Sequence, residues 1–225
     1  MTSLESVDAT NREVWSRILD QAELLYPDEQ VVRFLARRGR VRDGAGLDVG
    51  FGSGRHLKVL MDHGYRASGI EVIQDALDVA GKRFGDHPLL GELRLADMRG
   101  DAFPPGSFDV AVAWGVTFVR PKEEILTDLE GLARMLKPGG GLCVNFRTTD
   151  NWLYGLGEQV GESSWVLDDR AGVYSGAYYT FLTADEATGL LEKAGFQVDD
   201  MERFELWRDR ATKRHSWWNF TATRR

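Results

Sequence analysis

The sequence predicts an α/β fold, a three-layer sandwich in which helices cover both faces of a parallel sheet. Short apolar runs alternate with amphipathic helical segments between Leu47 and Phe146, and such alternation is typical of parallel sheets. Hydrophobic residues make up 43% of the 225-residue chain, which is enough for a full core. We expect a helical cap over residues 1–40 and one domain over residues 41–225.

Two helices are expected ahead of the first strand. Thr10 and Glu13 have the spacing of a capping box, and apolar residues recur after them at helical intervals as far as Leu25. Pro27 can open a second helix that ends near Gly39. Both helices lie outside the α/β alternation.

The alternation itself predicts five strands and three helices. The strands are expected at 47–49, 67–70, 93–95, 108–114 and 142–146, and the helices at 55–63, 74–83 and 122–136. Four residues that favour a turn, Pro138-Gly139-Gly140-Gly141, precede the fifth strand.

Residues 148–181 break this rhythm. They show no clear period but contain seven aromatic residues, namely Trp152, Tyr154, Trp165, Tyr174, Tyr178, Tyr179 and Phe181. A stretch of this length without regular structure inside a domain is usually functional. We interpret it as an insertion that forms a substrate wall; the alternative is that the rings only pack over the edge of the sheet.

The end of the chain returns to regular structure. Thr183 and Glu186 form a second capping box, which opens a helix that reaches Gly195. Two β-like runs, at 196–206 and 215–223, close the chain.

The composition limits the class of partner. The net charge is -7, so a phosphate backbone is repelled and nucleic acid is not expected as a partner. No apolar run approaches the roughly 20 residues of a membrane helix, and the N-terminal residues lack the pattern of a signal peptide. Cys143 is the only cysteine, so a reducing, cytoplasmic location is expected.

A glycine-rich turn after the first strand is the most informative motif. Residues 47–60 read LDVGFGSGRHLKVL, with glycines at three alternate positions and an acid, Asp48, two residues before the first of them. Glycine lets a backbone approach a ligand closely, and the N–H groups of the following helix point at the same crevice. The alternatives are a tight turn without a ligand and a dinucleotide site.

The dinucleotide alternative fits poorly. The G-x-G-x-x-G fingerprint needs glycine at position 55, where the chain has Arg55. The spacing Gly46-x-x-x-Gly50-x-Gly52 imitates the turn of short-chain dehydrogenases, but Gly46 precedes the strand residues. No tyrosine of the chain has the lysine four residues on that this family also needs.

A methyl-donor site fits better. Residues 48–54 resemble the D/E-x-G-x-G-x-G first motif of class I S-adenosylmethionine-dependent methyltransferases. Four further positions agree with this family in order and spacing. They are Glu71 at the end of the second strand, Asp97-Met98 after the third, Phe108-Asp109-Val110 at the start of the fourth, and Leu136-Lys137-Pro138-Gly139-Gly140 before the fifth.

The resemblance implies a Rossmann-like, doubly wound sheet of seven strands, mostly parallel with an antiparallel last strand. It also implies S-adenosylmethionine as the cofactor, with S-adenosylhomocysteine as its product, bound at the carboxyl ends of the strands. Glu71 would accept both ribose hydroxyls and Asp97 would meet the adenine amino group. The expected cofactor-binding residues are Asp48, Gly50, Phe51, Gly52, Gly54, Glu71, Asp97, Met98 and Trp114.

The methyl acceptor is expected to be a small organic molecule. The fourth strand continues as VAWGVT and lacks the N/D-P-P-Y/F stretch of amino-adenine and glutamine methyltransferases. A peptide or protein acceptor is one alternative, and a cofactor-binding cyclase or isomerase that does not methylate is another. The expected substrate residues are Trp15, Tyr26, His56, Arg147, Trp152 and Tyr179.

Two of these roles come from position alone. The helices before Leu47 could form a lid with Trp15 and Tyr26 facing inward, or they could be an ordinary amphipathic covering. Arg147 ends the fifth strand and could hold a substrate carboxylate.

No catalytic base stands out in the sequence. His215, near Trp217 and Trp218, and Tyr178 are the catalytic candidates. No compact group of acids or histidines has metal-ligand spacing, so no metal is expected. The sequence leaves open whether the chain is a monomer or a homodimer.

Overall fold

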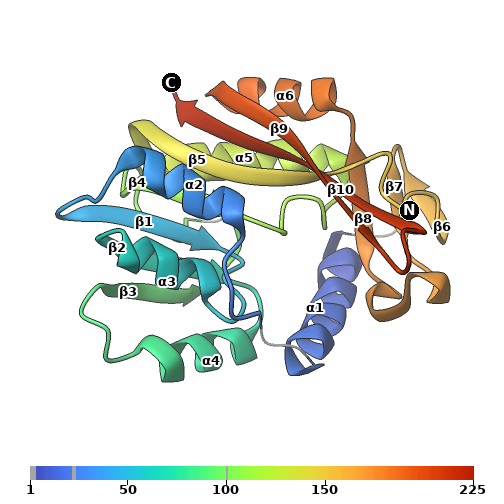
Figure 1. Ribbon diagram of the computed structural model, residues 1–225, viewed down its shortest axis with the longest axis horizontal. Coiled ribbons are helices and arrows are strands. Elements are labelled where there is room, and N and C mark those ends of the chain that lie inside the picture. Colours follow the sequence, from blue (N-terminus) through green and yellow to red (C-terminus); the bar gives the residue numbers. More distant parts are fainter. Residues whose placement is uncertain (1–3, 22–23, 100) are drawn as a thin grey trace.

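One sheet forms the middle layer of the structure, with helices on both of its faces (Figure 1). The structure is a computed structural model that describes residues 4–21, 24–99 and 101–225. Within these ranges the strands are β1 (Gly44–Val49), β2 (Tyr65–Glu71), β3 (Leu90–Leu95), β4 (Phe108–Ala113), β5 (Leu136–Thr148), β6 (Glu158–Gly161), β7 (Ser164–Val166), β8 (Tyr178–Leu182), β9 (Phe196–Arg208) and β10 (Lys213–Arg224). The helices are α1 (Leu4–Gln21), α2 (Glu29–Arg38), α3 (Arg55–Asp62), α4 (Gln74–Phe84), α5 (Lys122–Met135) and α6 (Ala184–Lys193), with a short 3-10 helix, η1 (Asp169–Tyr174).

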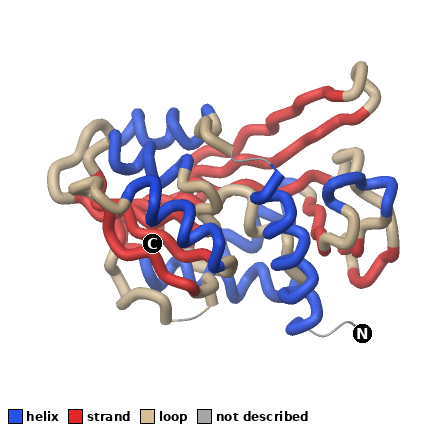
Figure 2. Tube along the Cα trace, turned by 90° about the horizontal axis from the view of Figure 1, so that it is seen from below, coloured by secondary structure: helices blue, strands red, loops and turns tan. Residues whose placement is uncertain are grey.

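Seven strands have the arrangement that the family resemblance implies. Their order is β3-β2-β1-β4-β5-β10-β9, and β1 to β5 pair in parallel. The last strand, β10, runs antiparallel to both neighbours. The predicted Rossmann-like fold is thus confirmed. The β9–β10 hairpin continues beyond the sheet and projects from the body of the molecule (Figure 2).

The insertion contains regular structure that the sequence did not reveal. β8 pairs with the end of β5 through Arg147 and Phe181, and β7 and β6 continue from it as antiparallel strands. These strands have only three to five residues, and every residue of β8 is buried. A strand so short and buried on both faces shows no alternation of apolar and polar residues.

Side chains of β5 show how the sheet divides the core. Leu142, Val144 and Phe146 face a cluster that contains residues of α5 and α6. Cys143 faces the opposite cluster, to which α2, α3 and α4 contribute. This alternation is the period of two that a strand imposes, and it places the ends of β1, β4 and β5 between two packed layers.

The two predicted capping boxes have different outcomes. At α6 the box is confirmed, since the Glu186 N–H donates to Thr183 Oγ1 and the Thr183 N–H donates to Glu186 Oε2 at 2.8 Å. At α1 the prediction is wrong, because the helix already begins at Leu4 and passes through Thr10. Residues 4–9 contain no glycine or proline that would stop the helix from extending toward the N-terminus.

The first helix does not cover a face of the sheet. α1 lies beside the insertion (Figure 1), and Val14 packs in a third cluster with Phe118, Leu153 and Tyr179. No helix in the described ranges is both long and apolar enough to span a membrane.

Candidate functional site

The glycine turn at the end of β1 has the geometry that only glycine adopts readily. Gly50, Gly52 and Gly54 have φ of +63°, +51° and +82°. A Cβ on Gly50 would lie 2.2 Å from Val116 Cγ1, so the turn excludes a side chain there by contact as well as by conformation. At Gly52, by contrast, a Cβ would meet only a Leu19 carbon of α1, at 3.6 Å. The backbone at Gly52 is therefore the open part of the turn, beneath α1.

Asp48 is a buried acid without a partner. Its side chain is 1% exposed, and neither carboxylate oxygen has a hydrogen-bond donor. Burial, together with the nearby charge of Glu71, raises its pKa to about 8, against the opposing charge of Arg55 and the Leu57 N–H, which lies near the carboxyl but outside hydrogen-bond geometry. Buried polar groups normally have partners, so this carboxyl is suited to a cationic donor such as the amino group of a methionine moiety.

Glu71 connects β2 to the glycine turn. The Gly52 N–H donates to Oε2 at 3.0 Å and the Val72 N–H donates to Oε1 at 2.7 Å. Burial raises the pKa of Glu71, and these backbone hydrogen bonds act against that rise. Each oxygen keeps a lone pair after its backbone hydrogen bond, so the side chain can still accept two hydroxyl donors, as the resemblance implies for ribose.

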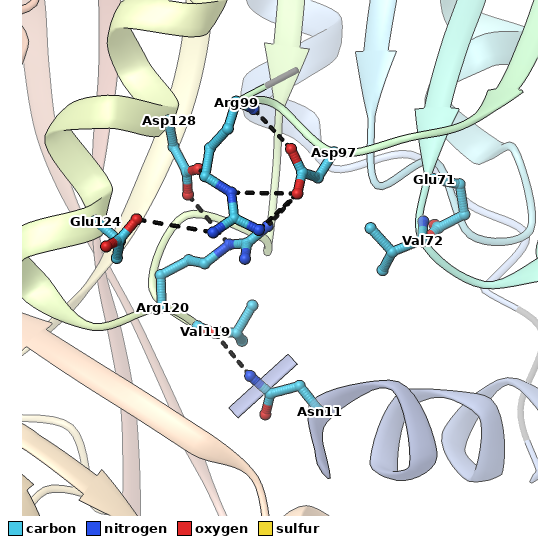
Figure 3. A network of polar contacts seen from close by, with 9 residues as sticks. All are labelled: Asn11, Glu71, Val72, Asp97, Arg99, Val119, Arg120, Glu124 and Asp128. Carbon is cyan, nitrogen blue, oxygen red and sulfur yellow. Dashed lines mark hydrogen bonds and ion pairs between the residues drawn. The ribbon is translucent and has the colours of Figure 1, made fainter. Parts of the chain in front are cut away.

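Asp97 belongs to a network of arginines and acids (Figure 3). It accepts hydrogen bonds from the Arg99 N–H at 2.9 Å and from Arg99 Nη2 at 2.6 Å. Arg120 Nε lies 3.2 Å from Asp128 Oδ2 of α5 and Arg99 Nη1 lies 3.7 Å from Glu124. Although burial acts to raise it, the Arg99 hydrogen bonds hold the pKa of Asp97 below its usual range. The network fixes the loop after β3 against α5.

Three other residues predicted to bind cofactor have different surroundings. The Phe51 side chain packs into the core toward Gly69, so its backbone rather than its ring belongs to the turn. Met98 is 3% exposed and packs in the cluster beneath α5. Trp114, at the end of β4, is partly buried and lies edge-on to His56, with ring centroids 6.5 Å apart. Their roles toward a cofactor stay predictions.

His56 contacts Asp28, the residue just before α2. The Asp28 N–H donates to His56 Nε2 at 3.3 Å, and Arg55 Nη2 lies 2.7 Å from Asp28 Oδ2. Burial lowers the pKa of His56, so the ring is neutral when it accepts this hydrogen bond. Tyr26, expected to face inward, is instead 84% exposed, because only its backbone is held, through its carbonyl and Arg55.

Four predicted substrate or catalytic residues come together beside β5. The Arg147 guanidinium carbon lies 5.4 Å from the ring centroid of Tyr179, and His215 stacks on Trp217 at 6.1 Å. Trp152 lies 5.8 Å from His215. Burial and the positive charges of Arg147, Arg208 and Lys213 lower the pKa of His215 to about 4, so its ring is neutral at pH 7.

Sequence reasoning missed the residues that complete this cluster. Phe118 and Trp217 also lie against the Arg147 guanidinium, at 5.0 and 4.8 Å. We call the rings of Phe118, Tyr179 and Trp217 the aromatic cage. Trp217 sits opposite Arg147 in the pairing of β10 with β5, and that register cannot be read from the sequence.

Tyr178 lies apart from the cage. Successive residues of a strand point to opposite faces, so Tyr178 and Tyr179 of β8 face different neighbours. The Tyr178 ring lies near Ser164 and Thr180, and burial raises the pKa of its hydroxyl. Among the residues that the structure describes, no three His, Cys, Asp or Glu side chains gather as metal ligands would.

Helix α1 spans the distance between the glycine turn and the cage. Asn11, which sequence reasoning also missed, donates from Nδ2 to the Val119 carbonyl at 2.7 Å and accepts from the Tyr178 N–H at 2.9 Å. Arg17 donates to the carbonyls of Val173 and Ser175. Trp15, predicted to line the substrate site, is partly buried and lies 6.4 Å from the Tyr174 ring.

Comparison with known proteins agrees with this geometry. A family model described as a methyltransferase domain matches residues 47–140. No curated protein matches the sequence of the chain. Among solved structures, an S-adenosylmethionine-dependent methyltransferase from Methanosarcina mazei is 22% identical with a TM-score of 0.71, covering 84% of this chain and 96% of that one.

Two further structures share the fold. The 1,6-didemethyltoxoflavin-N1-methyltransferase of Burkholderia thailandensis, solved with 1,6-didemethyltoxoflavin and S-adenosylhomocysteine, is 18% identical with a TM-score of 0.72, covering 100% of this chain and 91% of that one. The cyclase SpnF is 17% identical with a TM-score of 0.66, covering 96% of this chain and 93% of that one.

The region matched by the family model contains the residues on which the resemblance rests. It includes the glycine turn, Glu71 and Asp97, and it ends in the Pro138-Gly139-Gly140 segment. The unpartnered Asp48 carboxylate and the free lone pairs of Glu71 fit the amino group and the ribose of the methyl donor. Residues 47–140 thus match a methyltransferase domain, and the chain has the fold of solved S-adenosylmethionine-dependent methyltransferases.

Proposed function

We propose that this enzyme transfers a methyl group from S-adenosylmethionine to a small organic molecule by in-line displacement at the sulfonium. The observation that carries the proposal is the buried Asp48 carboxylate, which has no donor of its own and lies at a turn built for close approach. When bound, S-adenosylmethionine supplies an electrophilic methyl group on a positively charged sulfur.

The residues of the chain have distinct roles in this proposal. Asp48 binds the cofactor's amino group, Glu71 binds the ribose hydroxyls, and the Gly52 region lets the backbone approach closely. Asp97, oriented by Arg99, accepts from the adenine amino group. α1 and the insertion exclude water from the acceptor, which strengthens the electrostatic contacts inside.

Several features favour a small acceptor. The cage residues are mostly buried under α1 and the insertion, which suits a molecule that can be enclosed. The Burkholderia thailandensis neighbour was solved with a small heterocyclic molecule, and the net charge of -7 disfavours nucleic acid. The single buried cysteine, Cys143, fits a reducing cytoplasm, where we place the reaction.

The test is transfer of label. Purified enzyme is incubated with methyl-labelled S-adenosylmethionine and fractions of a metabolite extract, with Glu71→Ala as the variant impaired in binding. We expect label in a low-molecular-mass product with the wild-type enzyme and much less with Glu71→Ala. Label that stays only in protein-bound cofactor would contradict methyl transfer and favour a cyclase or isomerase, the activity that the SpnF neighbour represents.

A further inference from the structure

A buried arginine lies at the end of β5 without a counter-ion. Arg147 is 5% exposed, and its Nε and Nη1 atoms have no hydrogen-bond acceptor. It forms no ion pair with any residue that the structure describes. Three rings of the aromatic cage lie 4.8 to 5.4 Å from its guanidinium carbon. The face of an aromatic ring attracts a cation but is only a weak hydrogen-bond acceptor. The Nε and Nη1 N–H groups of Arg147 therefore stay without a proper acceptor.

Other donors near the cage also lack acceptors. The indole nitrogens of Trp15 and Trp152 are buried without a hydrogen-bond partner, and the Tyr179 hydroxyl lies near Arg147 but outside hydrogen-bond geometry. Burial raises the pKa of Tyr179, so its hydroxyl keeps its proton and can donate. A site whose unsatisfied groups are all donors is complementary to an acceptor-rich, negatively charged ligand.

The acids of the neighbouring hairpin are already paired with other cations. His215 is neutral and Arg208 adds positive charge near it, while Asp209 pairs with Lys213 at 3.1 Å and Glu205 with Arg203 at 2.5 Å. Asp150, an acid near the base of this hairpin, is already paired with Arg203 and Arg214, at 2.7 and 3.3 Å. The buried guanidinium thus has one uncompensated positive charge.

We propose that Arg147 binds a carboxylate of the methyl acceptor, so that the substrate of this enzyme is a small planar organic acid. This inference rests on the proposed methyltransferase function. A carboxylate carries the single charge that neutralises one buried cation, whereas a phosphate monoester carries nearly two and would leave a buried excess. The guanidinium fork also matches the two oxygens of a carboxylate.

The position of Arg147 agrees with a single-ring acid. The strand pairing puts Val49 of β1 level with Ala113 of β4 and Val144 of β5. Arg147 lies three residues beyond Val144, so it is about 10 Å across the sheet and about 10 Å along it from the end of β1, or about 14 Å in all. The carboxylate anchor and the glycine turn are therefore far enough apart for one ring between them. The cage provides the apolar walls that such a ring needs.

The test compares acids with neutral isosteres. Hydroxybenzoates and aminobenzoates, each with its matching carboxamide, are titrated into wild-type enzyme saturated with S-adenosylhomocysteine. Binding is followed by the fluorescence of the tryptophans, of which Trp152 and Trp217 lie in or beside the cage. We expect at least one acid to bind with a Kd at least tenfold lower than that of its amide.

Matched variants assign the effect to Arg147. Arg147→Met should lose this tenfold preference, and Arg147→Lys should keep part of it, because the charge remains but the fork is lost. Arg203→Met is the control, since Arg203 stacks on Trp218 at 5.3 Å but already has carboxylate partners. It should leave the preference unchanged.

The outcomes separate the two proposals. If wild-type enzyme binds no S-adenosylhomocysteine, the methyltransferase proposal fails. If it binds S-adenosylhomocysteine but binds acids no better than amides, only the carboxylate inference fails. Tighter binding of phenyl phosphate than of every acid would also overturn the carboxylate inference. If Arg147→Met still binds S-adenosylhomocysteine, that variant is folded and its preference for acids can be compared with that of the wild type. If Arg147→Met does not fold, Arg147→Lys is used for the comparison instead.

Discussion

At the scale of single residues, Asp48 makes the stability of the ligand-free protein depend on pH. Its pKa is about 8 in the folded state and near 3.8 in the unfolded state, so the folded protein binds the extra proton between these values. The free energy of unfolding therefore falls as pH rises through this range, by at most about 1.4 kcal/mol per unit. We expect a loss of about 1 kcal/mol between pH 7 and pH 8, measured by urea denaturation.

The control for this prediction is Asp48→Asn, which cannot ionise and should remove the slope. His215 has the opposite sign, because its lowered pKa makes the folded state lose stability as pH falls from about 6.5 toward 4. Measuring above pH 7 keeps His215 neutral in both states. Equal slopes for wild type and Asp48→Asn would show that Asp48 is already ionised at pH 7.

Glu71 gives a second prediction at the same scale. Replacing it with alanine removes the proposed acceptor for the ribose hydroxyls and leaves the Gly52 N–H without its partner. Losing one hydrogen bond to a charged group costs about 1.5–3 kcal/mol, so Glu71→Ala should raise the Kd of S-adenosylhomocysteine by at least about 10- to 100-fold by calorimetry. Glu92→Ala, which removes an exposed acid of β3, should leave it unchanged. An unaltered Kd in Glu71→Ala would move the ribose contact elsewhere.

The sequence predicts which residues lie at the candidate site better than it predicts the contacts that their side chains make. Asp48 and Glu71 are predicted because they match motifs of the methyltransferase family, and the distance between those motifs along the chain is set by the lengths of β1, α3 and β2. The bonds from Arg99 to Asp97 were not predicted, although only two residues separate them, because a side-chain direction is decided by tertiary packing. For the same reason Tyr26 was expected inside and lies outside.

At the scale of elements, the Asn11 side chain joins α1 to the segments around Val119 and Tyr178 by two hydrogen bonds, and a single substitution tests this connection. Asn11→Ala removes two hydrogen bonds and leaves the buried Tyr178 N–H unsatisfied, a cost of about 1–3 kcal/mol. We expect faster amide hydrogen exchange in α1 and in β8, with the core strands β1 and β4 unaffected. Arg12→Ala, on the exposed side of the same helix, is the control. Unchanged exchange in α1 would mean that its apolar contacts alone hold it in place.

The same local signal had different outcomes in two helices. The Thr183 box caps α6 because the strand β8 ends immediately before it and the chain must start a helix there. At Thr10 no preceding element forces a start, so helix propensity extends α1 to Leu4. A capping motif fixes a boundary only where the chain before it cannot be helical.

At the scale of the whole molecule, the two halves of the site differ in how far sequence could predict them. The glycine turn is formed within one short segment, so its chemistry is visible in the sequence. The aromatic cage and the arginine inside it come from four separate segments, which meet through the pairing of β5 with β8 and β10. The four residues are Phe118, Arg147, Tyr179 and Trp217. Single residues of the cage could be suspected, but their contacts depend on register, which sequence periodicity does not specify.

Because the proposed cofactor residues come from β1 and its glycine turn, from β2 and from the loop after β3, ligand binding should stabilise the fold as a whole. A ligand that binds only the folded state adds about 2.7 kcal/mol at 100 times its Kd. For a chain of this size that corresponds to a rise in Tm of about 5–10 °C with S-adenosylhomocysteine, measured by calorimetry. NADH should give no rise, since Arg55 stands where a dinucleotide turn needs glycine. A rise with NADH and none with S-adenosylhomocysteine would show that the turn binds a different nucleotide.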